Sequence, residues 1–384
     1  METYDVAIIG AGLAGLQLSH LLAEGGHTVA LVDRKAGLDQ AIHTTGIFVR
    51  RTLEDFSLPE DCLGPPVRQV RLYSPARRWL DLSSPHDEFR VGRMGLLYQR
   101  FLNRGIGDGV QWMPSTQFIE CTKLKGGMTV RLQDRAGSRL IRTKYIVGAD
   151  GANSRVAAAL GLDTNSEWIV GVEEVFEGVP LHGPAIFHCF IDPQIAPGYL
   201  AWAVHDGEQV HIGVGGYPRR FDPIQSLAKF RHSLGSILDL SQARLLERRG
   251  GRIPVGGVLR RIANTDGLLV GDAAGAVSPL TAGGLDPCLR LSFFAAEVIG
   301  KYLETGNPGV VAAYSGELFR ARFVSRLWMR RMISSVNSPI LVELGCALLR
   351  LPLIKAFARH IFFGRGSFPD SDPLPTAEPI ASTL

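Results

Sequence analysis

The chain has 384 residues, of which 46% are hydrophobic and 20% charged, and its formal net charge is +4. A chain of this length can bury a large core and exceeds the usual size of one compact domain, so we expect two lobes. The small positive excess is not the signature of a nucleic-acid-binding protein. The composition is that of a globular protein of the soluble type.

Cysteine spacing and the amino terminus both favour a cytoplasmic protein. The five cysteines show no CxxC pair and no histidine at a zinc-ligand spacing, so neither a metal site nor a disulfide framework is predicted. Glu2 and Asp5 precede the first apolar run, where a signal peptide would carry basic residues. We therefore expect a cytoplasmic location.

Residues 4–35 have the pattern of a strand, a helix and a second strand. The apolar run 6–9 predicts the first strand, and leucines at helical spacing after residue 15 predict the helix. Residues 28–32 predict the second strand, which ends in Asp33. This order is that of a βαβ unit.

Three glycines between the first strand and the helix form a GxGxxG sequence. Gly10 permits a tight turn, Gly12 lets the backbone approach a pyrophosphate, and Gly15 lets the helix pack closely on the strand. Helix N–H groups then face the anion, and Asp33 can accept hydrogen bonds from the adenosine ribose hydroxyls. The pattern predicts a dinucleotide site. The neighbouring residues expected at this site are Leu13, Ala14 and Arg34.

Two later segments help to choose between NAD and FAD. "YIVGADGANSRV" and "GLLVGDAAGAVSPLTAGG" each begin as an apolar strand and turn at an aspartate, Asp150 and Asp272. With GAGLAG before them, they resemble the three ordered motifs of the aromatic-hydroxylase-like flavoproteins, and within these the geranylgeranyl reductase branch. The resemblance runs from about Tyr4 to about Ala296. It implies that the cofactor is FAD.

The resemblance also implies how the third motif binds FAD. Asp272 would accept a hydrogen bond from a ribityl hydroxyl. Gly283 and Gly284 would lie against the pyrimidine edge of the flavin, ahead of a helix through about Gly300 whose N-terminus favours negative charge. The further cofactor-binding residues that it implies are Arg93, Asp150, Gly271 and Pro279.

Asp286 follows the third motif and has two interpretations. With Pro287 at the first helical position, Asp286 suits the cap of a helix. Alternatively, its carboxylate lies near the flavin and disfavours the anionic reduced form. We favour the cap.

The catalytic residue is not identified by the sequence. Residues 43–46, His-Thr-Thr-Gly, match a loop in which some archaeal reductases carry a catalytic cysteine, so no thiol is available here. His43 could move protons near neutral pH or could be a packing residue. The catalytic candidates are His43, Thr44 and Asp286.

Residues 166–259 alternate apolar and polar side chains between turns, which predicts an antiparallel sheet that roofs the flavin and binds substrate. Trp202 aligns with the tryptophan of a substrate-side motif of the reductases, while the proline of that motif falls on His205. Tyr199 and Trp202 are either pocket-lining residues or aromatics of the sheet core. The substrate-side candidates are Tyr199, Trp202 and His205.

The predicted fold class is α/β. A Rossmann-type FAD-binding domain with a central parallel sheet is expected from residues 1–50, 90–165 and 260–310, an antiparallel-sheet substrate domain from 51–89 and 166–259, a helical region from 311–367, and an extended tail from 368–384. Arg350, Pro352 and Lys355 break the apolar pattern too much for a membrane span. Residues 339–363 either lie on the inner face of a membrane or cap an apolar tunnel.

Three functions remain open, with a preferred order. The first is an FAD-dependent oxidoreductase that reduces carbon–carbon double bonds of a large apolar, isoprenoid-like substrate by hydride transfer from flavin N5. The alternative is an FAD-dependent monooxygenase that hydroxylates an aromatic or lipid substrate through a flavin C4a-hydroperoxide. The third is a flavoprotein that only carries electrons to a partner. Since no second nucleotide-binding motif is visible, the electron donor is expected to be external: NAD(P)H, ferredoxin or another donor.

Overall fold

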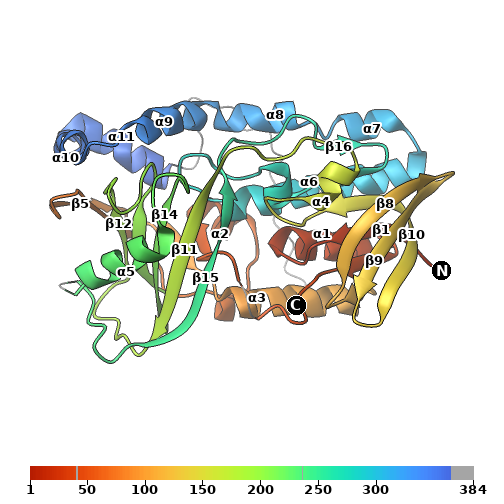
Figure 1. The fold of residues 1–384 in the computed structure, drawn as a ribbon, viewed down its shortest axis with the longest axis horizontal. Coiled ribbons are helices and arrows are strands. Elements are labelled where there is room, and N and C mark those ends of the chain that lie inside the picture. The colour runs from red at the N-terminus through yellow and green to blue at the C-terminus, as the bar shows by residue number, and fades with distance from the viewer. Residues whose placement is uncertain (40–41, 236, 365–384) are drawn as a thin grey trace.

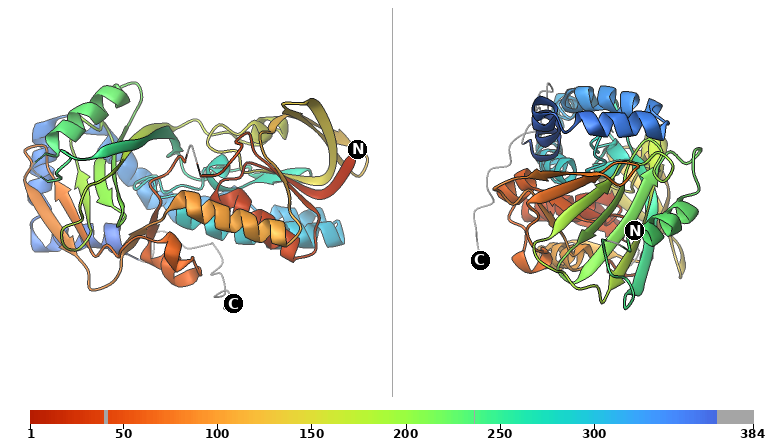
Figure 2. Two further views of the ribbon diagram at one scale, coloured as in Figure 1. Left: turned by 90° about the horizontal axis from the view of Figure 1, so that it is seen from below. Right: turned by 90° about the vertical axis from the view of Figure 1, so that its left-hand side faces the viewer.

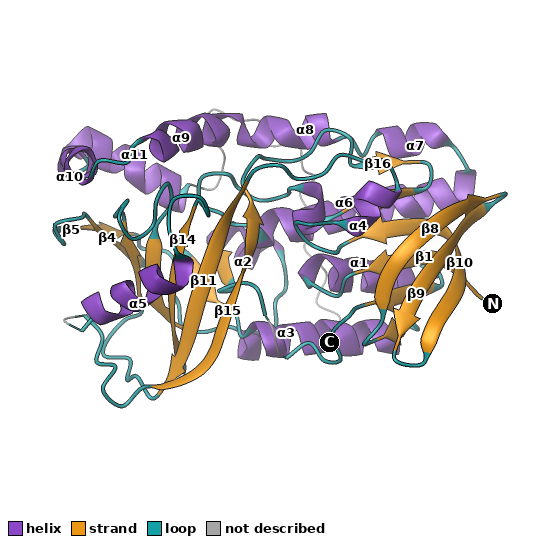
Figure 3. Ribbon diagram, in the orientation of Figure 1, coloured by secondary structure: helices purple, strands orange, loops and turns teal. Residues whose placement is uncertain are grey.

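The computed structural model describes residues 1–39, 42–235 and 237–364. Within these residues the chain builds two large sheets, one toward each end of an elongated molecule (Figure 1). The last helices of the chain, blue in Figure 1, run along the top of both. Coloured by secondary structure, the strands fall into two separate groups with helices between and above them (Figure 3).

The first sheet is built mainly from parallel strands in the order β16–β17–β10–β1–β2–β7. β1 runs parallel to β2 and β10, and β10 runs parallel to β17. Its central strands carry continuous apolar runs because helices and neighbouring strands bury both faces. The bounds are β1 (Glu2–Ile9), β2 (Val29–Val32), β7 (Gln111–Met113), β10 (Gly137–Gly148), β16 (Ala263–Asn264) and β17 (Gly267–Leu269), with β8 (Gln117–Leu124) and β9 (Gly127–Asp134) as an antiparallel extension of β10.

Three helices cover the first sheet. α1 (Leu13–Glu24) packs against both α3 (Met94–Gly107) and α6 (Leu285–Thr305). Of the leucines that predict α1, Leu16, Leu18 and Leu22 are buried and Leu21 is partly exposed, and the expected strand–helix–strand unit is confirmed. α6 ends at Thr305, and the Gly306 that follows has a positive φ of 64°, which suits a glycine after the last helical turn.

The second sheet has the order β15–β11–β14–β13–β12–β4–β5. Neighbouring strands are antiparallel except for β12 and β4, which are parallel. The predicted fold class, a parallel-sheet domain with an antiparallel-sheet domain and a helical carboxyl-terminal region, is thereby confirmed. The bounds are β4 (Gln69–Tyr73), β5 (Trp79–Ser83), β11 (Trp168–Glu177), β12 (Ile186–Phe190), β13 (Ala201–His205), β14 (Gln209–Gly216) and β15 (Arg244–Pro254).

Shorter elements join and cover the sheets. β3 (Ile47–Val49) pairs with β6 (Phe89–Val91), and α5 (Pro223–Ser233) packs on β11 and β14. Viewed from its left-hand end, the molecule carries the last helices above the second sheet (Figure 2). The remaining helices are α2 (Arg50–Asp55), α4 (Arg155–Ala159), α7 (Pro308–Ala312), α8 (Gly316–Arg320), α9 (Val324–Ser335), α10 (Pro339–Leu348) and α11 (Pro352–Phe363), with short 3-10 turns at Glu60–Cys62, Gly271–Ala274 and Ala321–Phe323.

The carboxyl-terminal region is helical as expected. In the part of the chain that the structure describes, no helix has both the length and the apolar character needed to cross a bilayer. The expected extended tail, 368–384, lies outside the described residues.

Candidate functional site

A cavity of about 1530 Å³ runs between the two sheets and beneath the carboxyl-terminal helices. At one end its wall is formed by the glycine-rich loops of the first sheet, and along its roof by strands β11, β13 and β15 of the second. The other end is apolar. Side chains that line this apolar end include Trp328, Met332, Leu341, Leu349, Phe357 and Phe362.

The GxGxxG glycines have the geometry that a dinucleotide site needs. Gly10 has a φ of +108°, and a Cβ there would lie 2.2 Å from the Ala149 carbonyl oxygen. A Cβ on Gly15 would lie 1.9 Å from the Gly10 carbonyl oxygen, so the helix can pack this closely only with glycine. Gly12, by contrast, lines the cavity at the start of α1 and has nothing within 4 Å of an added Cβ. Open space before a helix N-terminus fits a pyrophosphate.

Asp33 is held at the edge of the cavity by backbone hydrogen bonds. Its Oδ2 accepts from the Ala11 N–H at 2.7 Å, and its Oδ1 accepts from the Lys35 N–H at 2.8 Å. These bonds fix the carboxylate beside the first loop, where a ribose would follow the pyrophosphate. The adjoining cavity wall includes Leu13, Ala14 and Arg34, as expected.

Asp150, in the second motif, supports the turn below the first loop. Its Oδ2 accepts hydrogen bonds from the backbone N–H groups of Arg155 at 2.7 Å and Val156 at 3.2 Å. Burial raises the pKa of this carboxyl above its ordinary value. Among the described residues its buried Oδ1 has no hydrogen-bond partner, and the residue lines the cavity.

The carboxyl group of Asp272 faces the cavity without a hydrogen-bond donor from the described residues. Burial raises its pKa to about 6. Its main chain is fixed, because the Asn165 side-chain amide donates to the Asp272 carbonyl oxygen at 2.9 Å. A partly desolvated acceptor with no protein donor fits a hydroxyl-bearing ligand. Gly271, Gly283 and Gly284 line the same stretch of wall.

Four of the expected site residues do not line the cavity, and the first of them, Gly15, instead packs α1 closely against the Gly10 loop. Arg93 forms an ion pair with Glu208 at 2.8 Å, and Pro279 lies behind the wall that its neighbours form. His205 is buried in β13, where Nε2 lies 2.7 Å from the Val179 carbonyl oxygen and Nδ1 accepts from the Gly207 N–H. The predicted ligand contacts of Arg93, Pro279 and His205 stay predictions.

The preferred interpretation of Asp286 as a helix cap is wrong. Gly284 is the N-cap residue of α6, and Asp286 lies inside the first turn. Its carboxylate instead accepts hydrogen bonds from Arg290 Nε and Arg322, both at 3.0 Å, and from Thr52 at 3.1 Å. Burial disfavours its ionisation, but the two guanidinium charges outweigh this and lower the pKa.

His43 and Thr44 lie in the cavity wall beneath β15. The His43 Nδ1 lies 3.0 Å from the Gly250 carbonyl oxygen, and burial together with the charge of Lys35 lowers the pKa of the imidazole. Thr44 Oγ1 accepts from the Gly46 N–H at 3.1 Å, which shapes the loop. Both side chains face the region where the glycine loops meet the second sheet.

Tyr199 and Trp202 both line the cavity, and Trp202 lies on β13 whereas Tyr199 precedes that strand. Tyr199 donates its hydroxyl hydrogen to the Thr281 carbonyl oxygen at 2.6 Å, which ties the second sheet to the third motif. Trp202 packs edge-on against Tyr199 and donates its indole N–H to Glu173 Oε2 at 2.9 Å. Trp202 is therefore both a pocket-lining residue and a buried aromatic of the sheet, whereas Tyr199 is a pocket-lining residue only.

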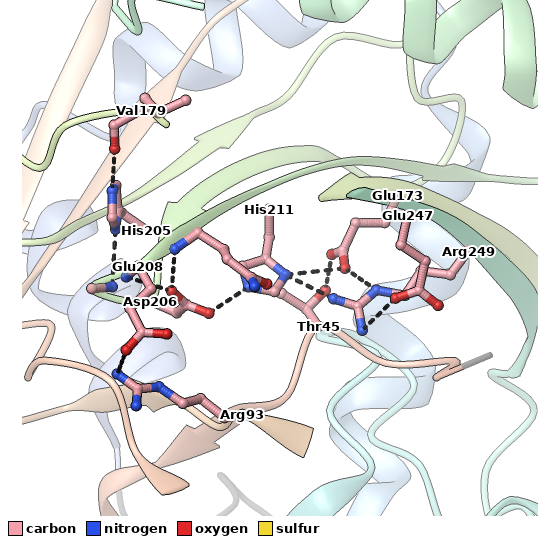
Figure 4. A network of polar contacts seen from close by, with 12 residues as sticks. Thr45, Arg93, Glu173, Val179, His205, Asp206, Glu208, His211, Glu247 and Arg249 are labelled. Carbon is pink, nitrogen blue, oxygen red and sulfur yellow. Dashed lines mark hydrogen bonds and ion pairs between the residues drawn. The ribbon is translucent and has the colours of Figure 1, made fainter. Parts of the chain in front are cut away.

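The sequence interpretation missed a buried polar cluster in the roof of the cavity. Glu173 on β11 contacts Thr45, Trp202, His211 and Arg249, and Figure 4 shows its contacts with Thr45, His211 and Arg249. The signal was the pair Glu173-Glu174 within an apolar strand. Successive strand residues point to opposite faces, so one of two adjacent glutamates must enter the side that faces the cavity.

Comparisons with known proteins agree with this geometry. The family model described as FAD binding domain matches residues 3–57 and 107–330. A digeranylgeranylglycerophospholipid reductase from Methanothrix thermoacetophila is 26% identical over 318 residues, which cover 80% of each protein. The motifs had already indicated this resemblance, and it is confirmed.

Two solved structures share the fold. A geranylgeranyl bacteriochlorophyll reductase-like protein from Thermoplasma acidophilum superposes with a TM-score of 0.83 at 18% identity, covering 96% of this chain and 97% of the other. The p-nitrophenol 4-monooxygenase of Pseudomonas putida gives a TM-score of 0.72 at 17% identity, covering 95% and 100%. Since the family model matches more than half of the chain, this protein belongs to the FAD binding domain family, and its cofactor is FAD.

Proposed function

We propose that this protein is an FAD-dependent oxidoreductase that reduces carbon–carbon double bonds of a large apolar, isoprenoid-like substrate. The observation that carries the proposal is the continuity of the cavity, which joins a dinucleotide-binding end to an apolar end. The digeranylgeranylglycerophospholipid reductase among the similar proteins supports the same chemistry. The monooxygenase among them shares the fold alone.

In this proposal three loops hold the cofactor. The open space at Gly12 and the N-terminus of α1 receive the pyrophosphate, and Asp33 receives the adenosine ribose. Asp272 accepts a hydrogen bond from a ribityl hydroxyl, while Gly283 and Gly284 allow close approach of the flavin. When bound and reduced, FAD supplies the hydride for the reduction.

The apolar end of the cavity holds the hydrocarbon chain and excludes water. Met332, Leu341 and Phe357 come from three different helices, α9, α10 and α11, and their side chains line it. Burying each methylene of the substrate contributes roughly 0.8 kcal/mol. We propose that electrons reach the flavin from an external donor, NAD(P)H or a redox protein such as ferredoxin, because the sequence has no second nucleotide-binding motif.

We also propose that α10 and α11 rest on an anionic membrane surface. Ile340 is 79% exposed and Leu353 is 87% exposed, although other residues of the same helices line the cavity. Arg331 on α9 and Arg359 on α11 are exposed as well and complement anionic lipid. A substrate carried by the membrane would then enter the cavity without crossing water.

The test is anaerobic single turnover. Enzyme reduced with dithionite is mixed with a geranylgeranyl lipid, and flavin absorbance and product mass are followed. We expect flavin reoxidation without oxygen and a product heavier by two hydrogens for each reduced bond. If reoxidation and product require oxygen and the product gains a hydroxyl, the reductase proposal is overturned in favour of a monooxygenase. Reoxidation only by a partner protein would indicate an electron carrier.

A further inference from the structure

A chain of buried polar groups leads from the cavity wall toward the protein surface. At the wall, the Thr45 hydroxyl and the Trp202 indole N–H both donate hydrogen bonds to Glu173 Oε2, and all three residues line the cavity. Glu173 is therefore the point at which the cavity meets the network drawn in Figure 4.

Behind the wall the chain continues through a histidine. His211 Nδ1 lies 3.3 Å from Glu173 Oε1, and its Nε2 lies 3.1 Å from Asp206 Oδ2. The three side chains are each no more than 5% exposed. Neither His211 nor Asp206 lines the cavity, so both side chains lie behind Glu173. From the cavity wall outward, the order is Glu173, His211 and Asp206.

The outer end of the chain lies in the turn between β13 and β14. Asp206 Oδ1 accepts hydrogen bonds from the backbone N–H groups of Glu208 at 2.9 Å and Gln209 at 2.6 Å. The Glu208 side chain is 61% exposed and pairs with Arg93. The hydrogen-bonded groups therefore lead from the cavity to a turn that is in contact with water.

Arg249 allows His211 to exist in two protonation states. Arg249 Nε donates to Glu173 Oε1 at 2.8 Å, and its NH2 group lies 2.9 Å from His211 Nδ1. A neutral His211 can accept from Arg249 at Nδ1, whereas a charged His211 can donate from Nδ1 to Glu173. Proton transfer requires a side chain whose neutral and charged forms both find hydrogen-bond partners, and His211 meets this requirement.

The charges that face His211 favour its protonated form. They come from Glu173 on β11, Asp206 in the turn and Arg249 on β15, with Glu247 3.9 Å from Arg249. Burial disfavours the imidazolium, but the hydrogen bonds to Asp206 and Glu173 outweigh burial and raise the pKa of His211 to about 9. The Glu173 carboxyl likewise loses solvation, yet His211 and Arg249 lower its pKa to about 2.

We propose that Asp206, His211 and Glu173 form a proton path that recharges the Thr45 hydroxyl, the group that protonates the substrate at the cavity wall. This inference rests on the proposed function. Reduction adds a hydride to one alkene carbon and a proton to the other, and the hydride with its two electrons comes from the reduced cofactor. The path supplies only the proton.

The proton balance closes at the surface turn. As the Thr45 O–H bond breaks, the new C–H bond forms, and the Thr45 oxygen takes a proton from Glu173, which is ionised at rest and carries that proton only in transit. Glu173 takes one from His211 Nδ1, and His211 takes one at Nε2 through Asp206, which exchanges with water. Each group ends the cycle in its starting state. Thr45 is the catalytic residue, and the other three act through it.

The first experiment is anaerobic single turnover by reduced wild-type, Glu173→Gln and His211→Asn proteins between pH 6 and 10. Glu173→Gln keeps the volume and can still accept from Trp202, but it does not carry a proton. We expect both variants to lose about 100-fold in rate, the scale of general acid catalysis, with unchanged FAD affinity. The wild-type rate should fall above about pH 9, where His211 loses its proton, and this fall should vanish in the variants.

The matched control is His20→Asn. His20 is another buried histidine paired with an aspartate, since its Nδ1 lies 2.6 Å from Asp108, but it lies on α1 and outside the cavity wall. The control should keep the wild-type rate and pH profile. If Glu173→Gln and His211→Asn also keep them, the proton path is overturned while the reductase activity stands.

A second measurement does not depend on turnover. In the full-length protein without cofactor, NMR of labelled histidine should show His211 titrating near pH 9, and at lower pH in Glu173→Gln and Asp206→Asn. A His211 pKa near the ordinary value of about 6.5 that ignores both substitutions would overturn the path. If wild-type enzyme reduces no isoprenoid lipid, the proposed function fails, and this titration still decides whether the three groups exchange protons as a unit.

Discussion

At the scale of single residues, Gly12 and Gly15 separate cofactor binding from folding. A Cβ on Gly12 meets nothing within 4 Å, and the φ of −78° at this position is accessible to any residue. We therefore expect Gly12→Val to fold normally but to purify without FAD, because its side chain occupies the space of the pyrophosphate. Flavin absorbance of the purified protein and thermal unfolding of the cofactor-free form measure the two effects separately.

Gly15→Val is the matched control for this prediction. Its Cβ would lie 1.9 Å from the Gly10 carbonyl oxygen, so the strand and helix must separate. This variant should lose stability as well as flavin. Full flavin occupancy in Gly12→Val would show that the first motif does not hold the pyrophosphate.

Some residues of the site could be identified from the sequence, and others could not. The glycines could be identified because only glycine fits the positive φ of Gly10 and the close approach at Gly15, and both requirements are local. The role of Asp286 could not, because its partners Thr52 and Arg322 come from other parts of the chain. The partners of Glu173 could not be identified for the same reason, although the adjacent Glu174 gave a hint that a charge enters the sheet.

At the scale of elements, the first turn of α6 is fixed by a buried ion cluster. The Arg290 side chain is fully buried and pairs with Asp55 and Asp286, and Arg322 also pairs with Asp286. We expect Asp286→Ala to lower the free energy of unfolding of the cofactor-free protein by about 3–5 kcal/mol, because two guanidinium groups lose a buried carboxylate. Urea unfolding measures this change.

A surface ion pair provides the comparison for Asp286. Glu317 pairs with Arg260, and both side chains are more than half exposed. Glu317→Ala should change stability by less than about 1 kcal/mol. Equal effects of the two substitutions would mean that the α6 cluster is not what holds this turn.

The sequence predicted the elements in which apolar residues recur at a regular spacing. It did not predict which distant strands pair with each other. Alternation in residues 166–259 indicated the antiparallel sheet because each strand has one buried face. Nothing local shows that β4 pairs in parallel with β12, since the two strands are far apart in the chain and their register follows from the packing of the sheet. For the same reason, the sequence could not show that α9, α10 and α11 line the cavity, since this depends on tertiary packing.

At the scale of the whole molecule, we expect the exposed apolar side chains of α10 and α11 to bind the protein to membranes. We expect the wild-type protein to float with vesicles that contain phosphatidylglycerol, and Ile340→Glu/Leu353→Glu to bind at least about ten-fold more weakly, since exposed apolar side chains enter the lipid interface. Both side chains are highly exposed, so folding should be unaffected. Added salt should weaken binding by screening the basic residues.

Ile224→Glu controls for the loss of apolar surface in general. Ile224 is 50% exposed, but it lies on α5, which packs on β11 and β14. The Ile224→Glu variant should therefore bind vesicles as strongly as the wild-type protein does. Unchanged binding by the α10/α11 double variant would contradict contact through these helices.

The order of strands in the first sheet also has a consequence for biosynthesis. β1 leaves the ribosome well before its partner β10, which ends at Gly148, and before β17, which pairs with β10 and ends at Leu269. The third glycine loop follows only at Gly284. During this interval the apolar β1 has an open edge that can associate wrongly. Cofactor loading is therefore a late event in translation, and a nascent chain that stalls before this loop has no complete flavin site to stabilise it.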